Sequence, residues 1–274
     1  MQMNYFKTVH EWIETQQSRG RYFFTMQEVI TETGKSSIAV QTALRRLRQK
    51  GAITCPRRGF YVLVPLEYRS VGSVPATWFI DDLMRHFEQP YYVGLLSAAA
   101  IHGAGHQQPL VFQVMTNKPT REVISGRVVI QFLMNKKVEQ MPVLALQTET
   151  GNMRVATPET TAFDLVRYGS AAAGLGNVGT VLVELAERID ARKLVSLASM
   201  VRLPDVQRLG YLLELLGEGK LVIPLAQWME TQRPRAVPLG QGSCRDLRPD
   251  PRWHVFPNET VETDHGTFLT SGSH

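Results

Sequence analysis

The stretch TMQEVITETGKSSIAVQTALRRLRQKG, residues 25–51, decides the fold of the amino-terminal part of the chain. Thr25 and Glu28 form a capping box that starts a short helix, because each side chain can satisfy a free backbone N–H, and Gly34 ends it. Ser37 is a good N-cap for a second helix, which runs to the next glycine. Two short helices joined by a tight turn that contains glycine indicate a helix-turn-helix unit.

The second of these helices has two different faces when its residues are placed 100° apart. Val40, Leu44 and Leu47 lie on an apolar face that should pack in a core. The opposite face carries Gln and Arg, which offer bidentate hydrogen bonds to adenine and guanine in the major groove, and an exposed Ile38 suited to a thymine methyl. An ordinary solvated surface helix is the alternative. The predicted DNA contacts of the turn and this helix are Lys35, Ser37, Ile38, Gln41, Thr42, Arg45, Arg46 and Gln49.

A hairpin is predicted directly after this helix. The β-rich runs 53–56 and 60–64 flank Arg57, Arg58 and a glycine, which suits the turn. In that position the hairpin would be a wing, and we expect Arg57 and Arg58 at its tip to lie against phosphates or an adjacent minor groove. With an amphipathic helix predicted over residues 4–17, residues 1–64 form a winged helix-turn-helix DNA-binding domain.

The distribution of charge supports this interpretation. Residues 1–70 contain eleven Lys and Arg against five Asp and Glu, whereas residues 71–274 contain nineteen against twenty. A basic surface confined to one small domain is typical of phosphate-backbone binding, because neutralised phosphates release condensed counterions. Double-stranded DNA is therefore the predicted partner.

The rest of the chain predicts a second domain of mixed composition. Residues 65–77 have no helical or strand period and contain Pro and Gly, so they are expected to be a linker. Residues 78–230 pass from helical and strand-like segments to almost continuous helix, and residues 231–274 form an irregular tail that is partly docked through a strand-like run at 253–256. The predicted fold class is α+β, with a mixed α/β domain that ends in a helical bundle after the winged helix.

Several stretches of this second domain resemble the AbiEi antitoxins of type IV toxin-antitoxin, or abortive infection, systems. They are YYVGLLSAAAIHG at 91–103, TPETTAFDLVR at 157–167, RLGYLLE at 208–214 and the late Arg252-Trp253 pair. Together with the basic winged helix, the resemblance covers residues 5–260. Its specificity comes from the combination, since each stretch alone is mostly apolar.

The resemblance implies a function in two parts. The amino-terminal domain would bind inverted repeats in the promoter of its own operon and repress it, and the domain at 78–230 would counteract a cognate nucleotidyltransferase-like toxin. It leaves open whether antitoxin and toxin touch each other. A ligand-responsive winged-helix transcriptional regulator, with a small molecule held by the second domain, is the alternative.

Other motifs carry no predicted chemistry. Residues 174–179 spell G-x-G-x-x-G, but no strand is predicted before them, so we expect no dinucleotide cofactor. His102 and His106 have no third ligand nearby, and Cys55 and Cys244 lie far apart, so no metal site is predicted. We also find no catalytic residues and expect a protein that is not an enzyme.

The chain is expected to be cytoplasmic. Its amino terminus has no basic region followed by an apolar stretch, and the longest nearly apolar run, residues 91–101, is about half of the roughly 20 residues that span a bilayer. No membrane partner is predicted.

Overall fold

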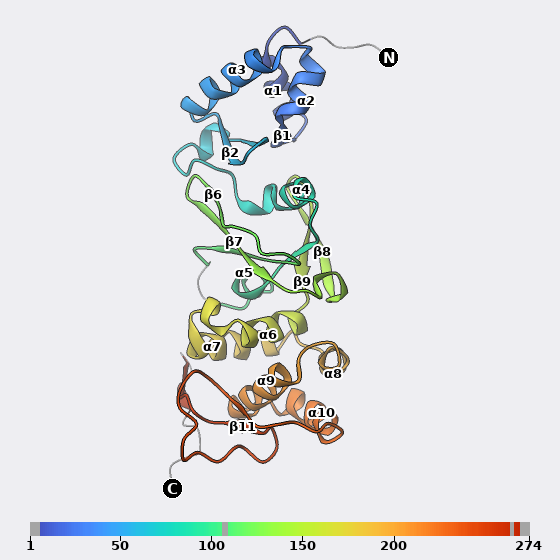
Figure 1. Ribbon diagram of the computed structural model, residues 1–274, viewed down its shortest axis with the longest axis vertical. Coiled ribbons are helices and arrows are strands. Elements are labelled where there is room, and N and C mark those ends of the chain that lie inside the picture. The colour runs from blue at the N-terminus through green and yellow to red at the C-terminus, as the bar shows by residue number, and fades with distance from the viewer. Residues whose placement is uncertain (1–5, 106–108, 264–265, 269–274) are drawn as a thin grey trace. The chain divides into compact units, whose positions relative to one another are not determined.

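The computed structural model describes residues 6–105, 109–263 and 266–268 (Figure 1). Contacts divide the chain into two compact units. Unit 1 is residues 1–93, 110–140 and 144–155, and unit 2 is residues 94–109, 141–143 and 156–274. The mixture of helices and sheets, with a winged helix first, confirms the predicted α+β class. The units do not coincide with the predicted domains, which remain a proposal about the segments that fold on their own.

The winged helix of unit 1 packs three helices over a three-stranded antiparallel sheet in the order β1-β3-β2 (Figure 1). The predicted capping box is present, because the Thr25 hydroxyl accepts from the Glu28 amide and the Glu28 carboxylate accepts from the Thr25 amide at 2.6 Å. Strand β1 was not predicted. The elements are α1 (Val9–Ser18), β1 (Phe23–Thr25), α2 (Met26–Thr33), α3 (Ser37–Gln49), β2 (Ile53–Arg57) and β3 (Phe60–Leu63).

Two helix starts differ from the predictions. Helix α1 begins at Val9 rather than at Asn4, because the Thr8 hydroxyl caps it by accepting from the Glu11 amide; Asn4 itself lies outside the described residues. Helix α3 is capped by Ser36, whose hydroxyl accepts from the Ala39 amide, so the predicted cap Ser37 is its first helical residue. At the second start two neighbouring serines could cap the helix, and the extended backbone of Ser36 makes it the cap.

The apolar face of α3 is buried as predicted. Val40, Leu44 and Leu47 belong to a core cluster with Trp12 and Phe24, whose rings meet edge to face at 5.3 Å. Burial of this face fixes which side of α3 is left to solvent.

The second part of unit 1 is a six-stranded mixed sheet in the order β6-β7-β5-β4-β9-β8. Strand β5 runs parallel to β7 and antiparallel to β4, and β4 is parallel to β9. Tyr91 and Tyr92 are buried in the interior strand β4. The elements are α4 (Ile80–His86), β4 (Tyr91–Val93), β5 (Phe112–Thr116), β6 (Val123–Ser125), β7 (Val128–Met134), the short 3-10 turn η3 (Val138–Gln140), β8 (Val143–Thr148) and β9 (Gly151–Ala156).

The segment predicted as a linker is a packed part of unit 1. It contains two 3-10 turns, η1 (Leu66–Tyr68) and η2 (Ala76–Trp78). Ser73 and Val74 are fully buried, and the Ser73 hydroxyl lies 2.8 Å from the Ser125 hydroxyl. Residues 65–77 are therefore an ordered, packed segment of unit 1 and not an exposed linker.

Unit 2 is mainly a helical bundle. Helix α6 starts as predicted, because Pro158 is its first residue and the Thr157 hydroxyl accepts from the Thr160 amide. The late Trp253 is fully buried beside Gly210, and its indole N–H donates to Glu214 of α9. The elements are α5 (Leu95–Ile101), α6 (Pro158–Arg167), η4 (Gly169–Ala172), α7 (Gly174–Ala186), α8 (Ala191–Ala198), α9 (Leu203–Leu215), α10 (Gly219–Glu230), β10 (Val237–Pro238), β11 (Val255–Phe256), β12 (Val261–Thr263) and β13 (Gly266–Phe268).

Candidate nucleic-acid interface

The solvent face of α3 presents the side chains predicted to read DNA. Ile38 is 75% exposed one residue after the start of the helix, although an isoleucine normally stabilises a protein by being buried. Gln41, Arg45, Arg46 and Gln49 are exposed along the same helix. Of the remaining predicted contacts, Ser37 is exposed, and Lys35 and Thr42 are half-buried.

The cations of this surface have no carboxylate partner among the described residues. The ion pairs of the winged helix lie elsewhere, between His10 and Glu14 on α1 and between Arg21 and Glu28. Burial raises the pKa of Glu28, but hydrogen bonds from Arg21 and from Thr25 outweigh it and leave that pKa below its ordinary value. Arg45 and Arg46 therefore have no ion-pair partner among the described residues, and their exposed guanidinium groups can meet phosphates.

Two further cations lie at the carboxyl end of α3 and were not among the predicted contacts. Arg48 and Lys50 are both exposed. Arg48 lies near strand β2, where burial raises the pKa of the Cys55 thiol and the charge of Arg48 opposes that rise. Arg48 lies in the last turn of α3 and Lys50 is its C-cap residue, so both charges stand at the end of the helix that leads into the hairpin.

The predicted wing is present, but its two arginines are placed differently. Arg58 is exposed in the turn, next to Gly59, whose φ of +84° suits glycine. Arg57 is the last residue of β2, paired with Phe60 across the hairpin. Its guanidinium carbon lies 5.2 Å from the centre of the Phe87 ring. Arg57 thus lies against an aromatic ring of unit 1 while Arg58 is exposed, and the contact of both arginines with DNA stays a prediction.

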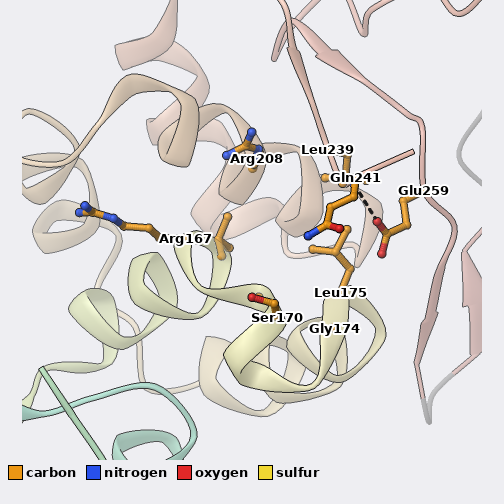
Figure 2. Close-up of a pocket in the computed structure, with 11 residues that line it drawn as sticks. Arg167, Ser170, Gly174, Leu175, Arg208, Leu239, Gln241 and Glu259 are labelled. Atoms are coloured by element: carbon orange, nitrogen blue, oxygen red, sulfur yellow. Dashed lines mark hydrogen bonds between the residues drawn. The ribbon is translucent and has the colours of Figure 1, made fainter. Parts of the chain in front are cut away.

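Unit 2 contains a separate cavity of about 400 Å³ with a polar lining (Figure 2). Arg208 on its wall donates from Nε to the Pro238 carbonyl at 2.8 Å. Glu259 accepts from the Gln241 amide at 3.3 Å, the bond dashed in Figure 2. The G-x-G-x-x-G run starts α7 at this wall, and a 3-10 turn precedes it where a dinucleotide fold has a strand.

The structure also bears on the histidines and on the metal and membrane sites considered in the sequence. His102 ends α5, and its Nε2 lies 2.7 Å from the Ala156 carbonyl; His106 lies outside the described residues. Within the described ranges, no group of three or more His, Cys, Asp or Glu side chains is arranged to hold a metal ion. In the same part of the chain, no helix combines the length and apolar character needed to cross a membrane.

The winged helix, followed by a mixed sheet and a helical bundle, places the chain in the class of α+β proteins with an amino-terminal winged helix. Residues 16–64 match a family model described as "Transcriptional regulator, AbiEi antitoxin", and residues 92–215 match one described as "AbiEi antitoxin C-terminal domain". The chain belongs to the AbiEi antitoxin family, which confirms the resemblance found in the sequence. It is accordingly an antitoxin of the type IV class.

A solved structure shares this fold. The crystal structure of the RV2827C protein from Mycobacterium tuberculosis superposes with a TM-score of 0.64 at 15% sequence identity, and the match covers 89% of each chain. Among proteins with curated descriptions, none matches this sequence.

Proposed function

We propose that this antitoxin binds double-stranded DNA in the promoter of its own operon and represses that operon. The observation that carries the proposal is the solvent face of α3, where an exposed Ile38 stands beside Gln41 and Arg45 and no described carboxylate neutralises the cations. In this proposal those three side chains read base edges in the major groove. The contacts that position the protein on phosphates are Lys35, Ser37, Thr42, Arg46, Gln49 and Arg58.

The geometry of helix-turn-helix modules predicts how the DNA site, or operator, is arranged. One α3 reads one half-site, so an inverted repeat would hold two copies of the protein related by a two-fold axis. The half-sites would then be spaced by a whole number of helical turns, about 10 base pairs each. Adding or removing five base pairs between them is expected to abolish binding by one of the two copies.

The DNA part is tested by measuring affinity for the duplex immediately upstream of the gene and for a scrambled duplex of equal length, at about 150 mM salt. A specific regulator is expected to bind the upstream duplex at least about 1,000-fold more tightly. Arg192→Ala, which removes one exposed charge from α8 in unit 2, is the matched control and should leave both affinities unchanged. Equal affinity for the two duplexes would refute specific promoter binding.

We further propose that the part of the chain at 78–230 counteracts a cognate nucleotidyltransferase-like toxin and that the antitoxin itself catalyses no reaction. Membership of the family model over residues 92–215 supports this proposal. The test is co-expression with the neighbouring toxin gene, with growth as the readout. Arg45→Ala should still rescue growth although it represses the promoter more weakly, and loss of rescue by this variant would contradict a separation of the two activities.

A ligand-responsive regulator is the second candidate, and the polar-lined cavity of unit 2 favours it (Figure 2). A small ligand would have to stabilise the folded protein by mass action and also release DNA. A thermal-shift screen of cellular metabolites, repeated with Arg208→Ala, tests this. A compound that raises the melting temperature of the wild type but not of the variant, and that weakens promoter binding, would support the second candidate.

A further inference from the structure

We propose that the hairpin β2–β3 is a coupling element that fastens the recognition helix to α4, and that Arg57 is its positioning residue and not a phosphate contact. The part of this inference that concerns DNA rests on the proposed function. The structural part concerns unit 1 alone and stands on contacts between described residues.

The tip of the hairpin is covered by α4. A Cβ atom built on Gly59 would lie 4.0 Å from Cε1 of His86, and the rings of Phe60 and His86 are 5.4 Å apart. The Arg57 guanidinium lies over the ring of Phe87 at 5.2 Å. A wing that enters a groove of DNA needs an open tip, and here the end of α4 lies against one side of the hairpin and leaves only Arg58 exposed in the turn.

The body of the winged helix is joined to the same part of unit 1. The Thr54 hydroxyl on β2 is 3.4 Å from the Ser125 hydroxyl on β6, which in turn bonds to the buried Ser73. The ring of Tyr22 meets Trp78 edge to face at 4.8 Å. The hairpin is thus held at its tip and along one strand.

The hairpin is also bonded to the helices that form the DNA-reading surface. The Gly59 carbonyl in the turn accepts from the Met26 amide, the first of α2, at 3.2 Å. The Ala52 amide donates to Leu47 of α3 at 2.9 Å, and the Val64 amide donates to Ala52 at 2.9 Å. A displacement of the tip is therefore transmitted to α2 and α3 through backbone hydrogen bonds.

Arginine suits the fastening role for physical reasons. Its planar guanidinium stacks on an aromatic face while keeping its charge, which a lysine ammonium does less well. To reach a phosphate, Arg57 would have to leave the Phe87 ring. Arg58, exposed in the turn, is then the phosphate contact that the hairpin retains.

The proposal is tested with four variants of the full chain: Arg57→Ala, Arg57→Lys, Phe87→Leu and Arg58→Ala. Deuterium uptake of the hairpin and of α4 is measured without DNA. Affinity for the upstream duplex is then measured from about 50 to 300 mM salt. The first three variants should accelerate exchange in both segments roughly two- to fivefold, the factor that corresponds to a surface cation–π contact. Their salt slopes should equal that of the wild type.

Arg58→Ala should show the opposite pattern, with unchanged exchange and a salt slope lower by about one. A similar drop of the slope in Arg57→Ala, with the slope kept in Arg57→Lys, would overturn the proposal because it identifies Arg57 as a phosphate contact. Unchanged exchange in Phe87→Leu would also overturn it. Failure of the wild type to prefer the upstream duplex would defeat the proposed function, while the exchange measurement would still decide the coupling.

Discussion

Substitution of Gly210 by alanine tests how unit 2 is held together. Gly210 lies in α9, and a methyl group there would come closer than 3.0 Å to three carbons of the Trp253 ring. That ring cannot move away easily, because it is fully buried, its N–H bonds to Glu214, and its backbone amide donates to Asp250 at 2.7 Å. Overpacking of this kind costs about 1–3 kcal/mol, and the rigid indole places it at the upper end.

The helix itself would gain about 1 kcal/mol from the loss of a glycine, so the net loss is about 2 kcal/mol. In thermal unfolding this corresponds to a melting temperature lower by roughly 4–8 °C. Gly219→Ala is the control: Gly219 opens α10 with nothing within 4 Å of its added methyl, and it should leave the melting temperature unchanged or slightly higher. A melting temperature of Gly210→Ala at or above the wild-type value would refute the packing argument. DNA affinity should stay unchanged, because the winged helix belongs to unit 1.

Three further predictions concern unit 1. Arg45→Ala should remove about 1–3 kcal/mol of discrimination at one base pair, whereas Arg58→Ala should weaken all duplexes alike; equal effects in a base-by-base binding assay would refute the division into reading and positioning. Thr25→Ala should lower the free energy of unfolding, measured in urea, by about 1 kcal/mol, whereas Thr31→Ala in the same helix should leave it unchanged. An unchanged free energy of unfolding in Thr25→Ala would show that the capping box contributes nothing. Burial raises the pKa of Asp82 to about 6, above its value of 3.8 when unfolded, so its protonated form stabilises the fold at low pH. That contribution, at most about 3 kcal/mol, should be lost as pH rises from 4 to 7. Asp82→Asn should remove this part of the pH dependence. Parallel curves of unfolding free energy against pH for the wild type and the variant would contradict this assignment.

Local features were predictable from the sequence because their causes are local. The capping box at Thr25, the glycine that ends α2, the two faces of α3 and the start of α6 at Thr157 each depend on side chains within one or two turns. These features also determine most of the proposed DNA-reading surface, since burial of one face of α3 leaves the other to solvent.

Features that depend on distant partners were missed. Strand β1 has three residues, too few for an alternating pattern, and forms because β3 lies beside it. Ser73 and Val74 looked like linker residues, yet they are buried by a hairpin more than fifty residues later. The position of Arg57 was missed for the same reason, because no sequence pattern around residue 57 predicts its contact with the distant ring of Phe87.

The order of segments along the chain limits how the two compact units can be inherited or separated. The backbone changes unit five times, after residues 93, 109, 140, 143 and 155. A single break in the gene therefore never yields both units intact, because even a break after residue 155, which keeps all of unit 1 together, leaves residues 94–109 and 141–143 of unit 2 on the other fragment. The two compact units therefore cannot be exchanged as cassettes by one crossover, because exchange of either unit alone requires several crossovers along the chain.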